Sequence, residues 1–309
     1  MRKKPLLALS AVIMATSAMM SVPVAGTAAV TSVDCPDTRE GSASRPRPGA
    51  HTMDRNDVSA EKAKAIQRDL HTKLANQARK AGTATVPVVF HVVYASDGTG
   101  NVSDSAIAAQ ITELNQDFAG AENPGTAANT GFSFTLQATR RWQNDAWFND
   151  PDSASGEAAL KTPTHEGDQR TLNIWSTNTS FLGYATFPWD FTSAPKLDGI
   201  VIQWGSLPGG PIANFNEGKT ASHEAGHWFG LFHTFQGGCS KTNDEVADTP
   251  AQRSPTSGCP EGKDTCKGKQ NPGLDPIHNY MDYSFDPCYN QFTPGQATRA
   301  QSMWAAYRA

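Results

Sequence analysis

Three histidines and a glutamate stand close together in the stretch HEAGHWFGLFH, from His223 to His233. In a helix, His223 and His227 are at positions i and i+4, so both imidazoles leave the same face one turn apart. Gly230 tolerates a positive φ and predicts the end of that helix, with a sharp turn that brings His233 back toward the other two. The stretch therefore predicts a short helix that ends at a glycine. The imidazoles of His223 and His227 on this helix would converge on one point with the imidazole of His233.

Three converging imidazoles form the ligand set of a catalytic Zn²⁺ site, which leaves the fourth tetrahedral position to water. Glu224 follows the first histidine, where its carboxylate can reach that water as a general base without binding the metal. The alternatives are a chance H-E-x-x-H and a solvated surface helix. The residues between the histidines are small, aromatic or aliphatic, and the glycine and third histidine of the longer pattern are both present. These features favour the zinc site.

The first 29 residues have the layout of a secretory signal peptide. Three basic residues, Arg2 to Lys4, precede an apolar run from Leu6 to about Met20, and small residues surround the expected cleavage point near Ala29. A membrane anchor is the alternative, but the run is short for a bilayer and is diluted by Ser and Thr. We therefore expect a secreted, extracellular product without a membrane anchor.

Residues 30–84 are polar and have little apolar periodicity. They could be a linker, but their place behind a signal peptide predicts a pro-region, with a helix from about Ser59 to Lys80. Beyond them, Val86–Tyr94 is β-branched and aromatic on both faces, as a buried strand requires. We predict one α+β catalytic domain over residues 85–309. Its expected elements are a helix after Ser103, strands at 132–137, 172–175 and 199–204, the histidine helix, and a last helix over 294–307 capped by Thr293.

A secreted chain can form disulfide bonds. Cys239, Cys259, Cys266 and Cys288 are close in sequence and contain no C-x-x-C pair, which favours two disulfides over a structural zinc and leaves three connectivities open. Cys35 is then the odd thiol. Because a thiolate binds zinc strongly, we hypothesise that Cys35 fills the fourth position in the precursor and keeps it latent. An intermolecular disulfide and a thiol without a role are the alternatives.

The full signature H-E-x-x-H-x-x-G-x-x-H resembles the metzincin clan of zinc endopeptidases. HNYMDY (278–283) is similar to that clan's methionine-containing turn, with Met281 as the turn methionine. VADTP, after the histidines, and NYMDYSFDPCYNQFTPGQ narrow the resemblance to the pappalysin-like or ulilysin-like (cytophagalysin) family of secreted metalloproteases. The resemblance covers roughly Val86 to Arg308.

This resemblance implies a metzincin-type zincin fold. An upper subdomain of twisted sheet and helices, including the zinc-binding helix, would face a loop-rich, disulfide-bonded lower subdomain across a cleft. The resemblance also implies the disulfide pairing Cys239–Cys266 and Cys259–Cys288. It places Tyr283 near the zinc, where the phenol would donate to the oxyanion on the scissile carbonyl. Core packing is the alternative role for Tyr283.

A second metal is a further hypothesis. Asp244, Glu245 and Asp248 offer the hard oxygen ligands that Ca²⁺ prefers, and calcium sites occur in related enzymes. A solvated acidic loop is the alternative.

The sequence thus predicts a secreted zinc metalloendopeptidase that hydrolyses peptide bonds in proteins with a metal-activated water. Lys and Arg number 26 against 30 Asp and Glu, and no long basic run occurs, which argues against nucleic acid as a partner. Protein or peptide substrates and a monomeric state are expected. The alternatives are a catalytically silent protease-fold binding protein and a zinc hydrolase of a non-peptide substrate. A silent protein would show a broken ligand set or would lack the base. Here the three histidines and Glu224 are all present.

Overall fold

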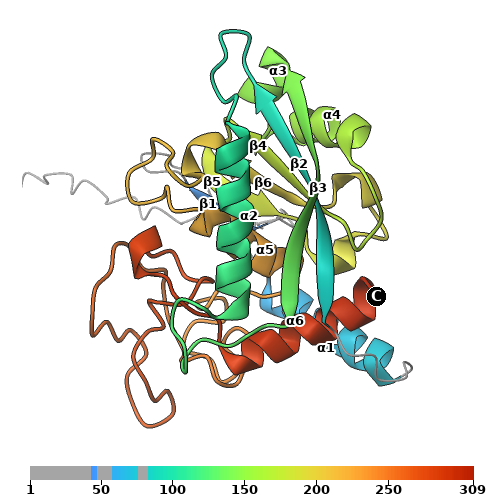
Figure 1. The fold of residues 1–309 in the computed structure, drawn as a ribbon. Coiled ribbons are helices and arrows are strands. Elements are labelled where there is room, and N and C mark those ends of the chain that lie inside the picture. The colour runs from blue at the N-terminus through green and yellow to red at the C-terminus, as the bar shows by residue number, and fades with distance from the viewer. Residues whose placement is uncertain (1–42, 47–57, 76–82) are drawn as a thin grey trace, which may run out of the picture. The chain divides into compact units, whose positions relative to one another are not determined.

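The structure is a computed structural model that describes residues 43–46, 58–75 and 83–309. The predicted signal peptide and Cys35 lie outside these residues. In the part of the chain that is described, no helix is both long and apolar enough to cross a membrane. The strands are β1 (Ala43–Pro46), β2 (Ala84–Tyr94), β3 (Phe132–Gln143), β4 (Leu172–Thr177), β5 (Phe181–Ala185) and β6 (Ile200–Gln203) (Figure 1). The helices are α1 (Ala60–Ala75), α2 (Asp104–Ala119), α3 (Asp145–Asn149), α4 (Ala154–Thr164), α5 (Lys219–Trp228) and α6 (Pro294–Tyr307), with short 3₁₀ turns η1 (Pro188–Asp190), η2 (Pro195–Leu197), η3 (Trp204–Ser206) and η4 (Asp286–Cys288).

The strands form one mixed sheet in the order β1-β5-β6-β4-β2-β3. β3, β2, β4 and β6 are parallel to one another, whereas β5 runs antiparallel to β6 and β1 runs antiparallel to β5. Residues Val88 and Phe90 of β2 face one core cluster, and Val93 faces another on the opposite side. Because both faces of the sheet are covered, its central strands are apolar almost without interruption.

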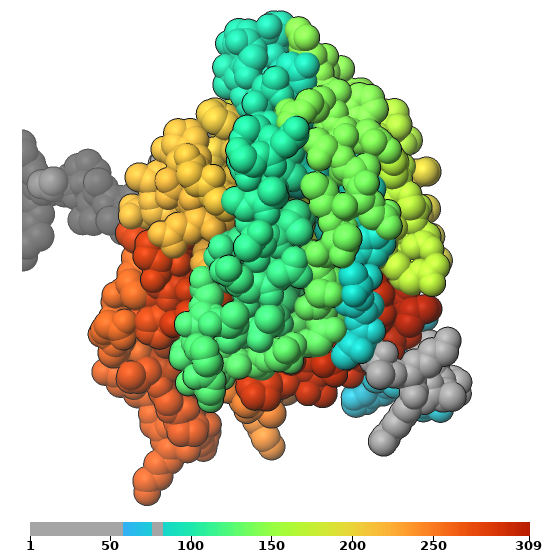
Figure 2. All heavy atoms as spheres, in the orientation of Figure 1, coloured from blue at the N-terminus to red at the C-terminus, as the bar shows by residue number. Residues whose placement is uncertain are grey.

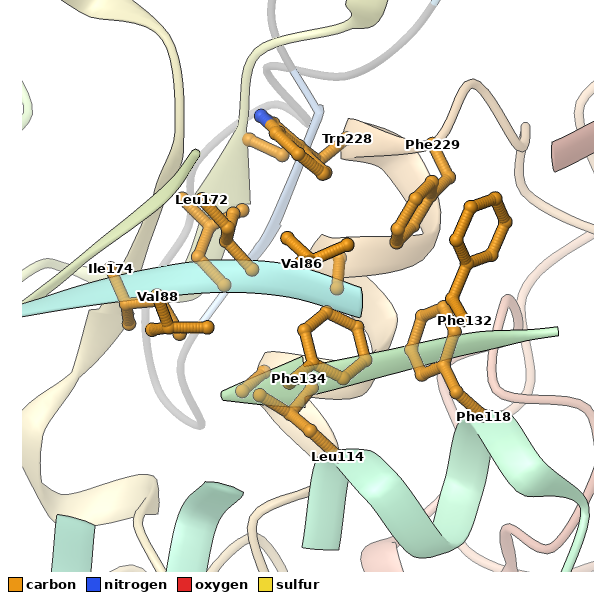
Figure 3. Close-up of a cluster of buried hydrophobic side chains, with 14 of the residues drawn as sticks. Val86, Val88, Leu114, Phe118, Phe132, Phe134, Leu172, Ile174, Trp228 and Phe229 are labelled. Atoms are coloured by element: carbon orange, nitrogen blue, oxygen red, sulfur yellow. The ribbon is translucent and has the colours of Figure 1, made fainter. Parts of the chain in front are cut away.

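The first core cluster lies between the sheet and the helices α2 and α5. Figure 3 shows Leu114 and Phe118 of α2 beside Phe134 of β3, with Phe229, just after α5, near Phe132. The rings of Phe118 and Phe134 meet edge to face at 4.9 Å, an arrangement that aromatic pairs prefer. Figure 2 shows the outer side of α2 as part of the surface, next to β3. α2 is therefore amphipathic, and its buried side packs on the sheet and on α5.

The ends of α2 follow from the local sequence. The hydroxyl of Ser103 accepts a hydrogen bond from the backbone N–H of Ala106 at 3.2 Å, as an N-cap does. Gly120 ends the helix with φ 68°, in the left-handed region.

The opposite face of the sheet carries α3 and α4. Phe148 and Leu160 from these helices pack with Trp175 of β4 and Tyr184 of β5. Sequence alone did not predict α3, α4 or β5, because α4 contains Gly156 and Pro163 and β5 is short and interrupted by Gly183. These residues ordinarily weaken helices and strands.

The region between α5 and α6 is loop-rich, as predicted. It contains the two disulfide bonds that the family resemblance implies, Cys239–Cys266 and Cys259–Cys288. α6 then begins with a capping box between Thr293 and Gln296.

α1 lies in the predicted pro-region and packs against α6. Ile66 and Leu70 share a buried cluster with Phe232 and Met303. At the polar margin of this contact, the hydroxyl of Tyr307 donates to Asp69 at 2.6 Å. The elements and the two disulfides together confirm the predicted α+β architecture with a loop-rich, disulfide-bonded half.

Candidate active site

α5 carries two of the three histidines, and every residue of this helix is buried. It begins after Gly218, whose φ is 90°, and is followed by Gly230, whose φ is 87°. The backbone N–H of Leu231 bonds to the carbonyl of Gly226 at 3.0 Å, which closes the helix end. The glycine turn after α5 then brings His233 back beside His227.

The three imidazoles converge through their Nε2 atoms. Nε2 of His227 lies 3.2 Å from Nε2 of His223 and 3.1 Å from Nε2 of His233. Bonds of the length usual for Zn–N in a tetrahedral site place ligand nitrogens about 3.3 Å apart. The described residues His223, His227 and His233 therefore fit a Zn²⁺ ion, as the sequence spacing predicts.

Backbone carbonyls set the tautomers of two of these rings. Nδ1 of His223 lies 2.6 Å from the carbonyl oxygen of Tyr280, and Nδ1 of His227 lies 2.8 Å from that of Leu231. Because a carbonyl only accepts, each Nδ1 carries the proton and each Nε2 keeps its lone pair. Burial also lowers the pKa of His227 to about 3. Both rings are thus neutral, which is the form of imidazole that can bind a metal ion.

The carboxylate of Glu224 lies against β5. A Cβ atom added to Gly183 would stand 2.7 Å from Cγ and 2.8 Å from Oε1 of Glu224. The backbone of β5 can pass this close only because residue 183 has no side chain. The role of Gly183 was not predicted, since only a glycine inside an apolar run marks it in the sequence.

The methionine-containing turn lies directly beneath α5. Met281 is fully buried, and a Cβ atom added to Gly226 would stand 2.3 Å from its Sδ. Two residues later, the ring of Tyr283 lies 4.9 Å from the ring of His233 and 5.6 Å from that of His223. Tyr283 is thus adjacent to two of the histidines, and Met281 is adjacent to the helix that carries His223 and His227.

The three acidic residues considered for calcium do not form a common cluster among the described residues. Asp248 accepts hydrogen bonds from Oγ of Thr293 at 2.7 Å and from N of Gly295 at 2.8 Å, so it caps α6. Asp244 is buried in its own loop, and burial raises its pKa to about 8. A cavity of about 450 Å³ borders Asp248, and none of the three histidines lines it.

The profile of the family described as Pregnancy-associated plasma protein-A matches residues 169–305. An extracellular metalloprotease of Pyricularia oryzae is 46% identical over 238 residues, which cover 75% of this chain and 79% of that protein. A mutant of Tannerella forsythia promirolysin superposes with a TM-score of 0.65 at 30% identity, covering 79% of this chain and 88% of the other. Mature mirolysin of the same organism, in complex with a cleaved peptide, gives 0.61 at 31% identity over 73% of this chain and 96% of the other.

Proposed function

The chain belongs to the pregnancy-associated plasma protein-A family of metallopeptidases, and on that premise we propose how its residues carry out zinc-dependent endopeptidase chemistry. The membership confirms the family resemblance, and the chain is a zinc-dependent endopeptidase. The observation that carries the proposed residue roles is the convergence of three Nε2 atoms at 3.1 and 3.2 Å. His223, His227 and His233 are the proposed metal ligands.

Bound Zn²⁺ supplies polarisation of the scissile carbonyl and lowers the pKa of an attacking water toward ~7. Glu224 takes the proton of that water and later delivers it to the leaving amine. The hydroxyl of Tyr283 donates a hydrogen bond to the oxyanion that develops on the carbonyl. Met281 forms the floor under the ligand-bearing helix. Its contact with the backbone of Gly226 supports this role.

The substrate backbone pairs with β5 in this proposal. In the structure β1 already occupies that edge, with Ala43 opposite Ala185 and Arg45 opposite Gly183. Cα atoms of β1 and α5 approach within 8 Å. An extended peptide that replaced β1 would gain the same backbone hydrogen bonds, a common mode of peptide binding at a sheet edge. It would pass Gly183, and so the carboxylate of Glu224.

The same pairing supports a latent precursor. Residues 30–84 would form a pro-region that blocks the β5 edge, residues 1–29 would direct secretion, and residues 85–309 would be the mature catalytic domain. Cys35 lies outside the described residues, and we propose that it reinforces latency as a ligand of the metal. Calcium has no support from the positions of Asp244, Glu245 and Asp248 and is not part of this proposal.

Chelation tests the main proposal. Processed protein from the culture medium should cleave casein, lose this activity with 1,10-phenanthroline, and recover it when Zn²⁺ is restored. Metal-loaded, folded protein that leaves casein intact would contradict the proposal and favour a silent binding protein. If it instead hydrolysed only non-peptide esters or amides, the non-peptide hydrolase would replace the endopeptidase.

Latency needs a separate experiment. Cys35→Ala in the uncleaved precursor should raise basal activity or hasten self-processing, because the proposed thiolate ligand is lost. Precursors that are equally silent with and without Cys35 would assign latency to the β5 blockade alone.

A further inference from the structure

A buried lysine at the start of α5 lies among carboxylates from α2 and the loop after it. Lys219 is 2% exposed, and its ammonium group forms ion pairs with Glu113, with Asp117 at 2.8 Å and with Glu122 at 2.5 Å. Asp117 is fully buried and also accepts a hydrogen bond from the hydroxyl of Ser222. The ammonium group thus occupies the centre of an acidic cluster, whose carboxylate oxygens lie as close together as the ligands of a metal ion.

The same cluster reaches the methionine-containing turn through Tyr280. The phenol of Tyr280 donates to Asp117 at 2.8 Å, with Glu122 at 3.0 Å as a second acceptor. The backbone carbonyl of Tyr280 accepts the Nδ1 proton of His223 at 2.6 Å. Two routes therefore run from the cluster to His223. One is the turn of α5 from Lys219, and the other is the backbone of Tyr280.

Stability alone is a poor reason for such a cluster. Burying ions has a large desolvation cost, and well-packed apolar residues often stabilise a protein as well as a buried ion pair does. Burial alone would lower the pKa of Lys219, but the surrounding carboxylates raise it above its ordinary value, so the lysine stays charged. The cluster instead fixes positions, because its hydrogen bonds hold α5 and the methionine-containing turn in place relative to α2.

We propose that Lys219, Asp117 and Tyr280 are positioning residues for the ligand His223. Lys219 fixes the first turn of α5 against α2. Tyr280 fixes the carbonyl that sets the tautomer and tilt of the His223 ring. This inference rests on the proposed role of His223 as a metal ligand. Groups that orient a ligand in this way typically change metal affinity or activity by 10- to 100-fold when they are removed.

Tyr280→Phe is the first test, because it removes only the hydroxyl and keeps the ring that packs on Tyr289 and Phe292. We expect zinc affinity, measured by competition with a chromophoric chelator, to fall by about tenfold or more. The visible spectrum of the Co²⁺-substituted protein should shift, and kcat at saturating Zn²⁺ should fall with little change in KM. The matched control is Tyr184→Phe, since the fully buried Tyr184 donates to the carbonyl of Pro151 at 2.6 Å on the other face of the sheet.

Asp117→Asn is the second test, because it removes one charge of the cluster at constant shape. Its control is Glu157→Gln, since Glu157 pairs at 2.7 Å with the buried Lys161 of α4, also on the opposite face. Both controls should lose thermal stability without changing zinc affinity or the Co²⁺ spectrum.

Two outcomes would overturn different claims. Wild-type protein that binds no zinc would refute the metal site itself. Wild-type protein that binds zinc, with Tyr280→Phe and Asp117→Asn matching their controls in affinity and spectrum, would refute only the positioning role and leave the cluster as a structural feature.

Discussion

In the proposed mechanism, the three histidines hold the metal ion and the neighbouring Glu224 transfers the proton. The carboxylate of Glu224 lies against Gly183, while three Nε2 atoms converge on one point. Glu224→Gln keeps the shape of the side chain and removes the base. We expect activity to fall by about 10²–10⁴-fold with zinc content and thermal stability unchanged, as measured by peptide cleavage and metal analysis. Activity within a few-fold of wild type would contradict the role of Glu224.

A second residue-scale prediction concerns pH and a histidine outside the site. His91 is fully buried, its Nε2 proton bonds to Oδ1 of Asn173 at 2.9 Å, and its Nδ1 accepts the indole N–H of Trp142 at 3.3 Å. This arrangement suits the neutral ring, and burial lowers the pKa of His91 to about 4. The unfolded chain then binds more protons than the folded one between pH 6.5 and 4. The stabilisation is therefore complete above the unfolded pKa and is lost as the pH falls toward 4.

The expected loss in the free energy of unfolding from His91 is about 2 kcal/mol between pH 7.5 and 5. Urea unfolding of metal-free protein across this range measures it. His91→Phe, which cannot take up a proton, should show a correspondingly shallower pH dependence. Parallel curves for the variant and wild type would assign the acid sensitivity to other groups.

Among site residues, spacing alone predicts those whose partners are near in sequence. His223 and His227 are one turn apart, and Gly230 marks the turn to His233. Lys219 and Asp117 have no such signal, because they meet only when α2 packs on α5, across 102 positions of the chain. A sequence pattern shows the periodicity within one helix or strand, whereas these contacts arise from the packing of two helices against each other.

At the scale of elements, β2 could be predicted because it is apolar on both faces, and α5 because its histidines are one turn apart. α2 and α6 could be predicted with the help of their side-chain caps, Ser103 and Thr293. β3 runs past its predicted end to Gln143 because it lies at the sheet edge, where Arg140 and Arg141 are exposed. β5 was missed because Gly183 weakens the strand pattern. The residue that hides this strand from prediction is the one that lets it pass close to Glu224.

Arg308, directly after α6, forms a buried ion pair with Asp198, which lies between η2 and β6, and a single substitution can break this pair. Arg308 and Asp198 are both fully buried and meet through two hydrogen bonds of 2.9 and 3.0 Å, and the guanidinium group lies 3.6 Å from the ring centre of Trp228. Arg308→Met leaves the carboxylate of Asp198 without its counter-charge. We expect a loss of about 3–5 kcal/mol in the free energy of unfolding, measured in urea.

The control for Arg308→Met is Arg140→Met, because Arg140 forms an ion pair with Glu166 in which the two side chains are 43% and 39% exposed. Removing an exposed pair should change the free energy of unfolding by less than about 1 kcal/mol. Equal effects of the two substitutions would show that burial does not set the strength of the Arg308 pair.

At the scale of the whole molecule, the loop-rich half depends on its two disulfides. The bonds span 27 and 29 residues, and their loops overlap in sequence. Replacing Cys239 and Cys266 together with serine reopens a loop of that size, which is worth about 3.5 kcal/mol in the chain-entropy description. Urea unfolding of the double variant and wild type measures the difference. Four free thiols in folded wild-type protein, or unchanged stability in the variant, would contradict this prediction.

The two edges of the sheet differ in a way that bears on storage and handling of the enzyme. β3 carries Arg140 and Arg141 at one edge, and charged edge strands resist pairing with other chains. β5, at the other end, has no charged residue and is covered by β1. Once the proposed pro-region has been removed, the edge of β5 is as open to a neighbouring enzyme molecule as to a substrate peptide. Aggregation should therefore begin with pairing at the β5 edge, and a segment of another enzyme molecule that is cleaved in autolysis should bind there too. The precursor should be the form that stays intact and soluble at high concentration.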